Sequence, residues 1–151
     1  MRVGFVTQAE ACERLIVGFK APLTPIGKAR PRFTRWGGVY TPPATHMAER
    51  KLALACRQAL SDFVKPSDAP IRIAIRACFA IPSSASQKKR AAMLGQPVTK
   101  KPDADNIAKL VLDALNGIAY TDDKQVFSVS VEKRYALEDS MAIDVLETLL
   151  S

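Results

Sequence analysis

The chain has 151 residues, of which 48% are hydrophobic, and it carries a formal net charge of +7 at pH 7. This size and composition favour one folded domain with an ordinary core and exclude wholesale disorder. The sequence also contains neither a run of about 18 apolar residues nor a secretory leader, so we expect no membrane contact. The excess of positive charge favours a polyanionic partner.

The N-terminal part of the chain predicts one strand and a basic hairpin. Residues 1–13 show no clear pattern, so we expect an N-terminal extension followed by a single domain over residues 14–151. Leu15–Lys20 reads as a first strand. Pro22–Tyr40 is rich in proline, glycine, cations and aromatics, and its Gly37-Gly38 pair predicts a hairpin turn.

The middle of the chain alternates between helical and strand patterns. A helix is predicted over 44–64, with Thr41 as a candidate N-cap. Its apolar positions at helical spacing are Ala48, Leu52, Cys56, Ala59, Leu60 and Phe63. Ile71–Ile81 alternates strictly between apolar and other residues, which predicts a long half-buried strand. Gln87–Leu94 is a candidate short basic helix.

The C-terminal part predicts a central helix and two further strands. The helix is expected from Asp105 to Asn116, with Gly117 as its C-terminal cap. Alternation over 127–132 predicts a strand, and Met141–Leu149 predicts the last one. The predicted fold class is therefore α+β: a single compact domain with a mixed β-sheet packed against two main helices.

The few cysteines and the single histidine limit which metal sites and catalytic groups the protein can have. Cys12, Cys56 and Cys78 are far apart and form no CxxC pair, which favours reduced thiols in a cytoplasmic protein over disulfides or a zinc site. His46 is the only histidine, so most zinc and Ser-His-Asp chemistry is excluded. We expect His46 to be a helix residue without a catalytic role.

Acidic residues gather around the predicted central helix of this basic protein. Asp103 and Asp105 open the helix, and Asp122 and Asp123 follow it. Carboxylates packed closely raise one another's pKa unless a positive group lies among them. A hard divalent cation such as Mg²⁺ prefers oxygen ligands and often binds substrate phosphate as well. The pattern therefore suggests an enzyme that binds a polyphosphate and cleaves it.

Helical geometry leaves ordinary structural roles open for each of these residues. Asp105, Lys109 and Asp113 share the outward face of the helix. A capping aspartate, an ion pair between Lys109 and Asp113, and an Asp-Asp turn would be structural alternatives. Spacing does not decide which end of the helix Asp122 and Asp123 reach. A calcium loop starting at Asp103 is excluded because the glycine and glutamate that it needs are missing.

Three segments together resemble a known signature. They are Lys101-Pro-Asp-Ala-Asp-Asn-Ile-Ala-Lys109, Leu112-Asp-Ala-Leu-Asn-Gly117 and Asp122-Asp-Lys-Gln-Val126. This combination resembles the RusA-like Holliday junction resolvases, which are Mg²⁺-dependent endodeoxyribonucleases of bacteria and their phages. Gly27–Arg32 and Val39–Pro42 resemble two further elements of phage-type members. The resemblance covers roughly residues 15–135.

The resemblance implies roles for individual residues. The metal-binding carboxylates would be Asp103, Asp105 and Asp123, with Asp122 in a supporting role. Lys109 would be the essential lysine and would neutralise charge on the phosphate. Asn106 also matches the signature, where a helix-start role is at least as good as a catalytic one. The implied cation is Mg²⁺, with Mn²⁺ as the alternative, and no small-molecule cofactor is implied.

Basic residues outside the acidic cluster are candidate DNA contacts. Phe33, Trp36 and Tyr40 lie among the cations of the predicted hairpin and would stack on unpaired bases, although Phe33 or Trp36 in the core is the alternative. Each cation singly is also consistent with a solvated surface. The candidate DNA-binding residues are Lys28, Arg30, Arg32, Arg35, Lys88, Lys89, Arg90, Lys100 and Lys101.

The resulting hypothesis is a structure-selective endodeoxyribonuclease that resolves four-way DNA junctions by paired symmetric nicks in recombination and repair. A homodimer, which the resemblance also implies, would match the two symmetry-related strands of a junction. The expected location is the cytoplasm of a bacterium or of a phage-infected host. Two alternatives remain: a Mg²⁺-dependent nuclease for flaps or other branched DNA, and a non-catalytic junction-binding protein. An RNA-directed module lacks any matching signature.

Overall fold

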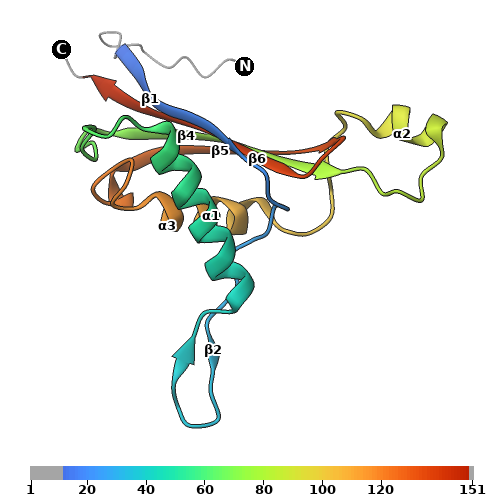
Figure 1. Ribbon diagram of the computed structural model, residues 1–151, viewed down its shortest axis with the longest axis horizontal. Helices are drawn as coiled ribbons and strands as arrows, with labels where there is room; N and C mark the ends of the chain where they lie inside the picture. Colours follow the sequence, from blue (N-terminus) through green and yellow to red (C-terminus); the bar gives the residue numbers. More distant parts are fainter. Residues whose placement is uncertain (1–11, 150–151) are drawn as a thin grey trace, which may run out of the picture.

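The computed structural model describes residues 12–149, which form an α+β fold around one four-stranded sheet (Figure 1). The strand order is β1-β6-β4-β5. β4 and β5 pair in parallel, whereas β6 pairs antiparallel with β1 and with β4. The sheet strands are β1 (Cys12–Ala21), β4 (Ile71–Ala80), β5 (Val126–Ala136) and β6 (Ser140–Leu149); the helices are α1 (Pro43–Ala59), α2 (Gln87–Met93) and α3 (Ala104–Leu115).

Helices α1 and α3 pack against each other on one face of the sheet (Figure 1). The alternation in β4 turns Ile71, Ile73 and Ile75 toward them, and all three are buried. Ile107 and Leu110 of α3 are fully buried against this face. The opposite face carries Arg72 and Arg76 at the alternate positions of β4, and no helix in the described part of the chain covers it.

The link from β4 to β5 fixes the direction of α3. Because β4 and β5 are parallel, the chain must return to the starting end of β4 before β5 begins. Helix α3 makes this return, so its N-terminus lies near the end of β4 and its C-terminus near the start of β5. The chain leaves α3 at Asn116, which is extended, so the predicted cap Gly117 is not the C-cap; it follows at a φ of 80°, in the left-handed region that favours glycine, and its N–H donates to the Tyr120 carbonyl.

A two-stranded hairpin leaves the body of the protein. Its strands are β2 (Arg32–Phe33) and β3 (Val39–Tyr40), which pair antiparallel. Figure 1 shows the hairpin extending away from the sheet, beyond the N-terminal end of α1. The predicted hairpin is confirmed, but its turn is centred on Arg35 and Trp36, and Gly37 follows them at a φ of 82°.

Three further details of the fold differ from the predictions. Helix α1 ends at Ala59 and not near residue 64, because Leu60 is extended, and Phe63 is 96% exposed. Pro42 occupies the N-cap position of α1, so Thr41 is not the cap. Strand β1 already begins at Cys12, while residues 1–11 of the predicted extension lie outside the described residues. Within residues 12–149, no helix is long and apolar enough to cross a membrane.

Candidate active site

The first half of α3 presents three charged side chains to solvent. Asp103 is the N-cap residue of the helix, yet its side chain makes no capping hydrogen bond. Asp105 and Lys109 are exposed on the following turns. Among the described residues, none of these three side chains has a hydrogen-bond or ion-pair partner. Both carboxylates and the ammonium group are therefore free to contact a ligand.

Lys28, and not Lys109, forms the ion pair with Asp113. Its Nζ lies 3.2 Å from Asp113 Oδ2 and also pairs with Glu49 of α1. The alternative of an ion pair between Lys109 and Asp113 is therefore wrong. Desolvation lowers the pKa of Lys28, but its hydrogen bonds to Glu49 and Asp113 outweigh that effect, so the net shift is upward.

The segment that carries Lys28 is fixed directly on α3. The backbone N–H of Lys28 donates to the Asn106 carbonyl at 3.0 Å. A Cβ at Gly27 would lie 2.7 Å from Asn106 Cβ, so only glycine permits this close approach. Between the two segments is an open pocket of about 390 Å³. It is lined by Pro25, Ile26, Gly27, Lys28, Lys101, Pro102, Asp103 and Asn106.

A short 3₁₀ helix (Asp123–Gln125) holds the second acidic pair beyond the far end of α3. Asp122 caps this helix, because its carboxylate accepts from the Lys124 N–H at 3.2 Å. Gln125 accepts from the Asp122 N–H and donates to the Ser67 and Ala69 carbonyls. The hydrogen bond from the Lys124 backbone lowers the pKa of Asp122, whereas the hydrogen bond with the Asp122 side chain raises the pKa of Asp123.

The structure separates the carboxylates that the resemblance assigned to one metal. Asp103 and Asp105 lie at the N-terminal end of α3, whereas Asp122 and Asp123 follow its C-terminal end. A helix of this length spans about 18 Å. The charge of Asp113, in the last turns of α3, acts on Asp123. Within residues 12–149 no group of three or more His, Cys, Asp or Glu side chains lies close enough together to hold a metal ion.

The candidate DNA-binding residues fall into three groups. Arg30, Arg32 and Arg35 lie on or beside the hairpin and are exposed. Lys88, Lys89 and Arg90 belong to α2, which projects from one end of the sheet in Figure 1. Lys100 and Lys101 lie just before Pro102 and Asp103, and Lys101 lines the pocket. Lys28 differs from all of these, because its side chain is only 20% exposed and is occupied by two carboxylates.

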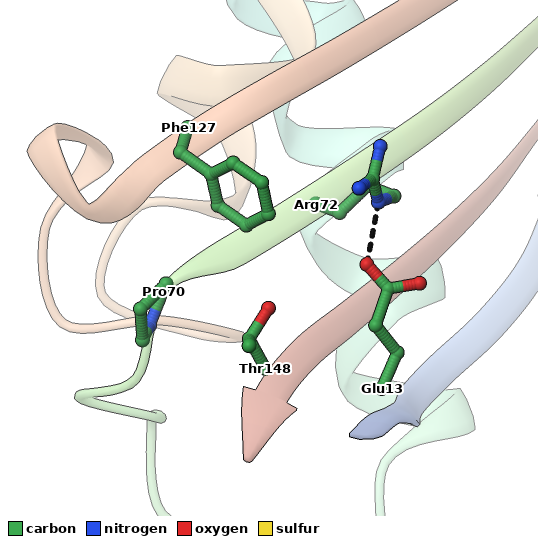
Figure 2. Close-up of a pocket in the computed structure, with 5 residues that line it drawn as sticks. All are labelled: Glu13, Pro70, Arg72, Phe127 and Thr148. Atoms are coloured by element: carbon green, nitrogen blue, oxygen red, sulfur yellow. Dashed lines mark hydrogen bonds and ion pairs between the residues drawn. The ribbon is translucent and has the colours of Figure 1, made fainter. Parts of the chain in front are cut away.

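A larger hollow lies on the uncovered face of the sheet, away from the acidic cluster. Figure 2 shows its lining residues, Glu13, Pro70, Arg72, Phe127 and Thr148, around a space of about 570 Å³. Arg72 Nε donates to Glu13 at 2.6 Å, and its guanidinium carbon lies 5.2 Å from the centre of the Phe127 ring. The only acid in this hollow is already paired, so the pocket beside α3 remains the better candidate.

Two residues of the site region carry roles that the sequence did not reveal. Glu49 lies on α1 and accepts from Lys28, a contact that depends on how two distant segments dock. Gln125 anchors the Asp122-Asp123 loop with three hydrogen bonds. The signal for Gln125 was present, because an aspartate followed three residues later by glutamine is the spacing of a capping box.

The protein combines a mixed sheet, exposed carboxylates at the start of α3 and a basic hairpin. These features place it among α+β proteins with an exposed acidic site. Residues 22–145 match the family model described as Endodeoxyribonuclease RusA. The chain therefore belongs to the RusA endodeoxyribonuclease family, which acts on Holliday junctions. It is also similar to the uncharacterized protein YqaN of Bacillus subtilis (strain 168), with 32% identity over 131 residues that cover 82% of this chain and 90% of that protein.

Proposed function

We propose that this protein is a Mg²⁺-dependent, structure-selective endodeoxyribonuclease that resolves Holliday junctions by paired symmetric nicks in recombination and repair. The observation that carries the proposal is the set of unpartnered charges at the start of α3. Asp103, Asp105 and Lys109 are held by one helix, and none is used for capping or for an ion pair among the described residues. Two carboxylates and a lysine gathered at one helix start, in a protein that is otherwise basic, are the groups that bind a divalent cation and a phosphate.

The roles of the residues follow from their chemistry. Asp103 lines the pocket and Asp105 is exposed two residues further along the chain, so the two carboxylates would supply oxygen ligands to a divalent cation. Lys109 supplies a compact positive charge for the phosphate oxygens that become more negative as the phosphodiester bond is cleaved. Lys101, at the rim of the same pocket, would hold a neighbouring DNA phosphate.

The cation is expected to be Mg²⁺, with Mn²⁺ as the alternative. Two carboxylates leave most positions of an octahedral cation to other oxygens. Water and the DNA phosphate can supply some of them, and Asp123 of the same chain lies at the wrong end of α3. We therefore include Asp123 in the site as a residue that acts from a second chain.

We propose a homodimer, because it would bring in Asp123 of a second chain and match the symmetry of the substrate. A four-way junction offers two equivalent strands, and a twofold dimer places two equivalent sites against them. The dimer can be tested by mixing two inactive variants, Asp105→Asn and Asp123→Asn. If each chain completes the site of the other, the mixture regains up to about a quarter of the activity, since one mixed site per heterodimer is intact. No recovery in mixtures shown to exchange subunits would place the whole site within one chain.

The proposed activity is tested with a panel of matched DNA substrates. Purified protein is incubated with Mg²⁺ and a four-way junction, a flap or the linear duplex of the same sequence. Paired nicks in opposite strands of the junction, with little cleavage of the other DNAs, support a resolvase. Preferential cleavage of the flap would assign the protein to other branched DNA instead. Tight junction binding without cleavage under Mg²⁺ or Mn²⁺ would leave a non-catalytic binding protein.

A further inference from the structure

The tip of the hairpin exposes a large aromatic side chain that the fold does not use. Trp36 is 91% exposed and Phe33 is 80% exposed. The alternative that either residue belongs to the core is therefore wrong. Figure 1 shows the hairpin projecting from the body, so the tip reaches a partner before the sheet does. A tryptophan side chain that is exposed at the tip of a projecting hairpin indicates a surface that contacts a binding partner.

The turn holds Trp36 in a defined position. Gly37 N–H donates to the Thr34 carbonyl at 3.2 Å, and Thr34 N–H donates to the Gly38 carbonyl at 2.6 Å. These bonds make Arg35 and Trp36 the two central residues of the turn, and Gly37 follows in the left-handed region. The Thr34 hydroxyl also accepts from Gly38 N–H at 2.8 Å. The indole is thus carried by an ordered tip.

The charges around the tip favour a nucleic acid as its partner. No aspartate or glutamate occurs between residues 22 and 48. Arg30, Arg32 and Arg35 have no ion-pair partner within residues 12–149. Arg32 lies opposite Tyr40 across the hairpin, which places a cation beside an aromatic ring. Unpaired arginines combined with exposed aromatic faces are the elements that bind phosphates and stack on bases.

The hairpin is also anchored beside the candidate active site. Its first strand follows the Gly27-Lys28 segment, which is bonded to Asn106 of α3 and lines the pocket with Asp103. Trp36 lies eight positions after Lys28, so the tip is at most about 29 Å from this anchor. A single junction can therefore contact both the pocket and the tip.

We propose that Trp36 stacks on an unpaired or unstacked base at the branch point and thereby makes this protein prefer branched DNA over continuous duplex. The proposal rests on the proposed function, because it assigns substrate selection to the same nuclease. Every base has a flat face, so stacking needs no particular sequence. A continuous duplex hides those faces within its stack, whereas a branch point exposes them.

The experiment uses Trp36 as its own probe, because it is the only tryptophan of the chain. The full chain is titrated in EDTA with a four-way junction and with linear duplex, and binding is followed separately by the anisotropy of a label on a DNA end. At saturation, the junction should quench the tryptophan emission, while the duplex should leave it nearly unchanged.

Trp36→Ala should weaken junction binding roughly 5- to 150-fold, as loss of one stacked base predicts, and leave duplex binding within about twofold. Trp36→Phe should retain part of the junction preference. Phe63→Ala is the matched control, since Phe63 is an equally exposed aromatic, 96% accessible, outside the hairpin. It should bind both DNAs like the wild type.

Several results would overturn this assignment. Emission unchanged at saturating junction, or Trp36→Ala with full junction preference, would remove the tip from recognition. Emission that changes with protein concentration in the absence of DNA would assign the tip to a contact between copies. These failures are separable from that of the nuclease, because cleavage in Mg²⁺ and its loss in Asp105→Asn are read independently of the tryptophan signal.

Discussion

The Nζ of Lys28 lies 3.2 Å from the Asp113 carboxylate, and the same ammonium group also pairs with Glu49. One lysine thereby joins α1, α3 and the segment that leads into the hairpin. Asp113 pairs with Lys28 and not with Lys109, which has no ion-pair partner among the described residues. The two ion pairs give Lys28 a structural role, while its contact with DNA stays a prediction.

Replacing this lysine should destabilise the protein. Lys28→Met leaves two partly buried carboxylates without their cation, so we expect the free energy of unfolding to fall by about 1–3 kcal/mol. Denaturant unfolding measures the change. Lys88→Met is the control, since Lys88 is exposed on α2, and its effect should stay below about 0.5 kcal/mol. Equal effects for the two variants would contradict the structural role of Lys28.

The contribution of Lys28 should disappear at high pH. Its pKa in the folded protein is raised above the ordinary value of 10.5, so folding favours the protonated form. The stabilisation is therefore fully present below about pH 10 and is lost as the pH rises through the raised pKa. The difference in unfolding free energy between wild type and Lys28→Met should be constant from pH 7 to 9.5 and shrink above pH 10.5. A difference that persists undiminished at pH 12 would contradict this.

The close approach of Gly27 to α3 should be sensitive to a single methyl group. The Cβ of Gly27→Ala would lie 2.7 Å from Asn106 Cβ, so either α3 or the Gly27-Lys28 segment must shift. We expect a loss of about 1–3 kcal/mol in stability and slower junction cleavage, since the pocket lies at this contact.

A second glycine provides the matched control for this substitution. A Cβ at Gly18 would also come within 2.7 Å of a neighbour, but that atom is a carboxylate oxygen at the end of the exposed Asp144 side chain. The Asp144 side chain can rotate away, so Gly18→Ala should cost less than about 0.5 kcal/mol and leave cleavage unchanged. If Gly27→Ala behaved like Gly18→Ala, the docking of the segment on α3 would not position the site.

The central helix and the long strand could be predicted because the spacing of apolar residues within each segment is enough to specify them. The alternation over Ile71–Ile81 and the helical spacing after Asp105 each need only one apolar face, and both elements are confirmed. Phe63 continued the helical spacing of α1 in the sequence, but the chain leaves the helix at Leu60. The spacing of apolar residues alone therefore does not indicate the residue at which a helix ends.

The arrangement of the site depended on contacts between distant segments. The position of Asp123 follows from the parallel pairing of β4 and β5, which the sequence did not specify. The pairing of Lys28 with Asp113 depends on an irregular segment docking on α3. Neither relationship leaves a periodic signal in the sequence, because both are set by contacts between segments that lie far apart along the chain.

The assignment of the active site to the start of α3 is tested most directly by comparing Asp105→Asn with Asp62→Asn in the cleavage of a labelled four-way junction. Asp105 belongs to the unpartnered carboxylates of α3, whereas Asp62 is exposed in the loop after α1. We predict paired symmetric nicks by the wild type and Asp62→Asn in Mg²⁺, none in EDTA, and at least a roughly 100-fold slower reaction for folded Asp105→Asn. Cleavage by Asp105→Asn at the wild-type rate, or wild-type cleavage that persists in EDTA, would contradict the assignment of the active site.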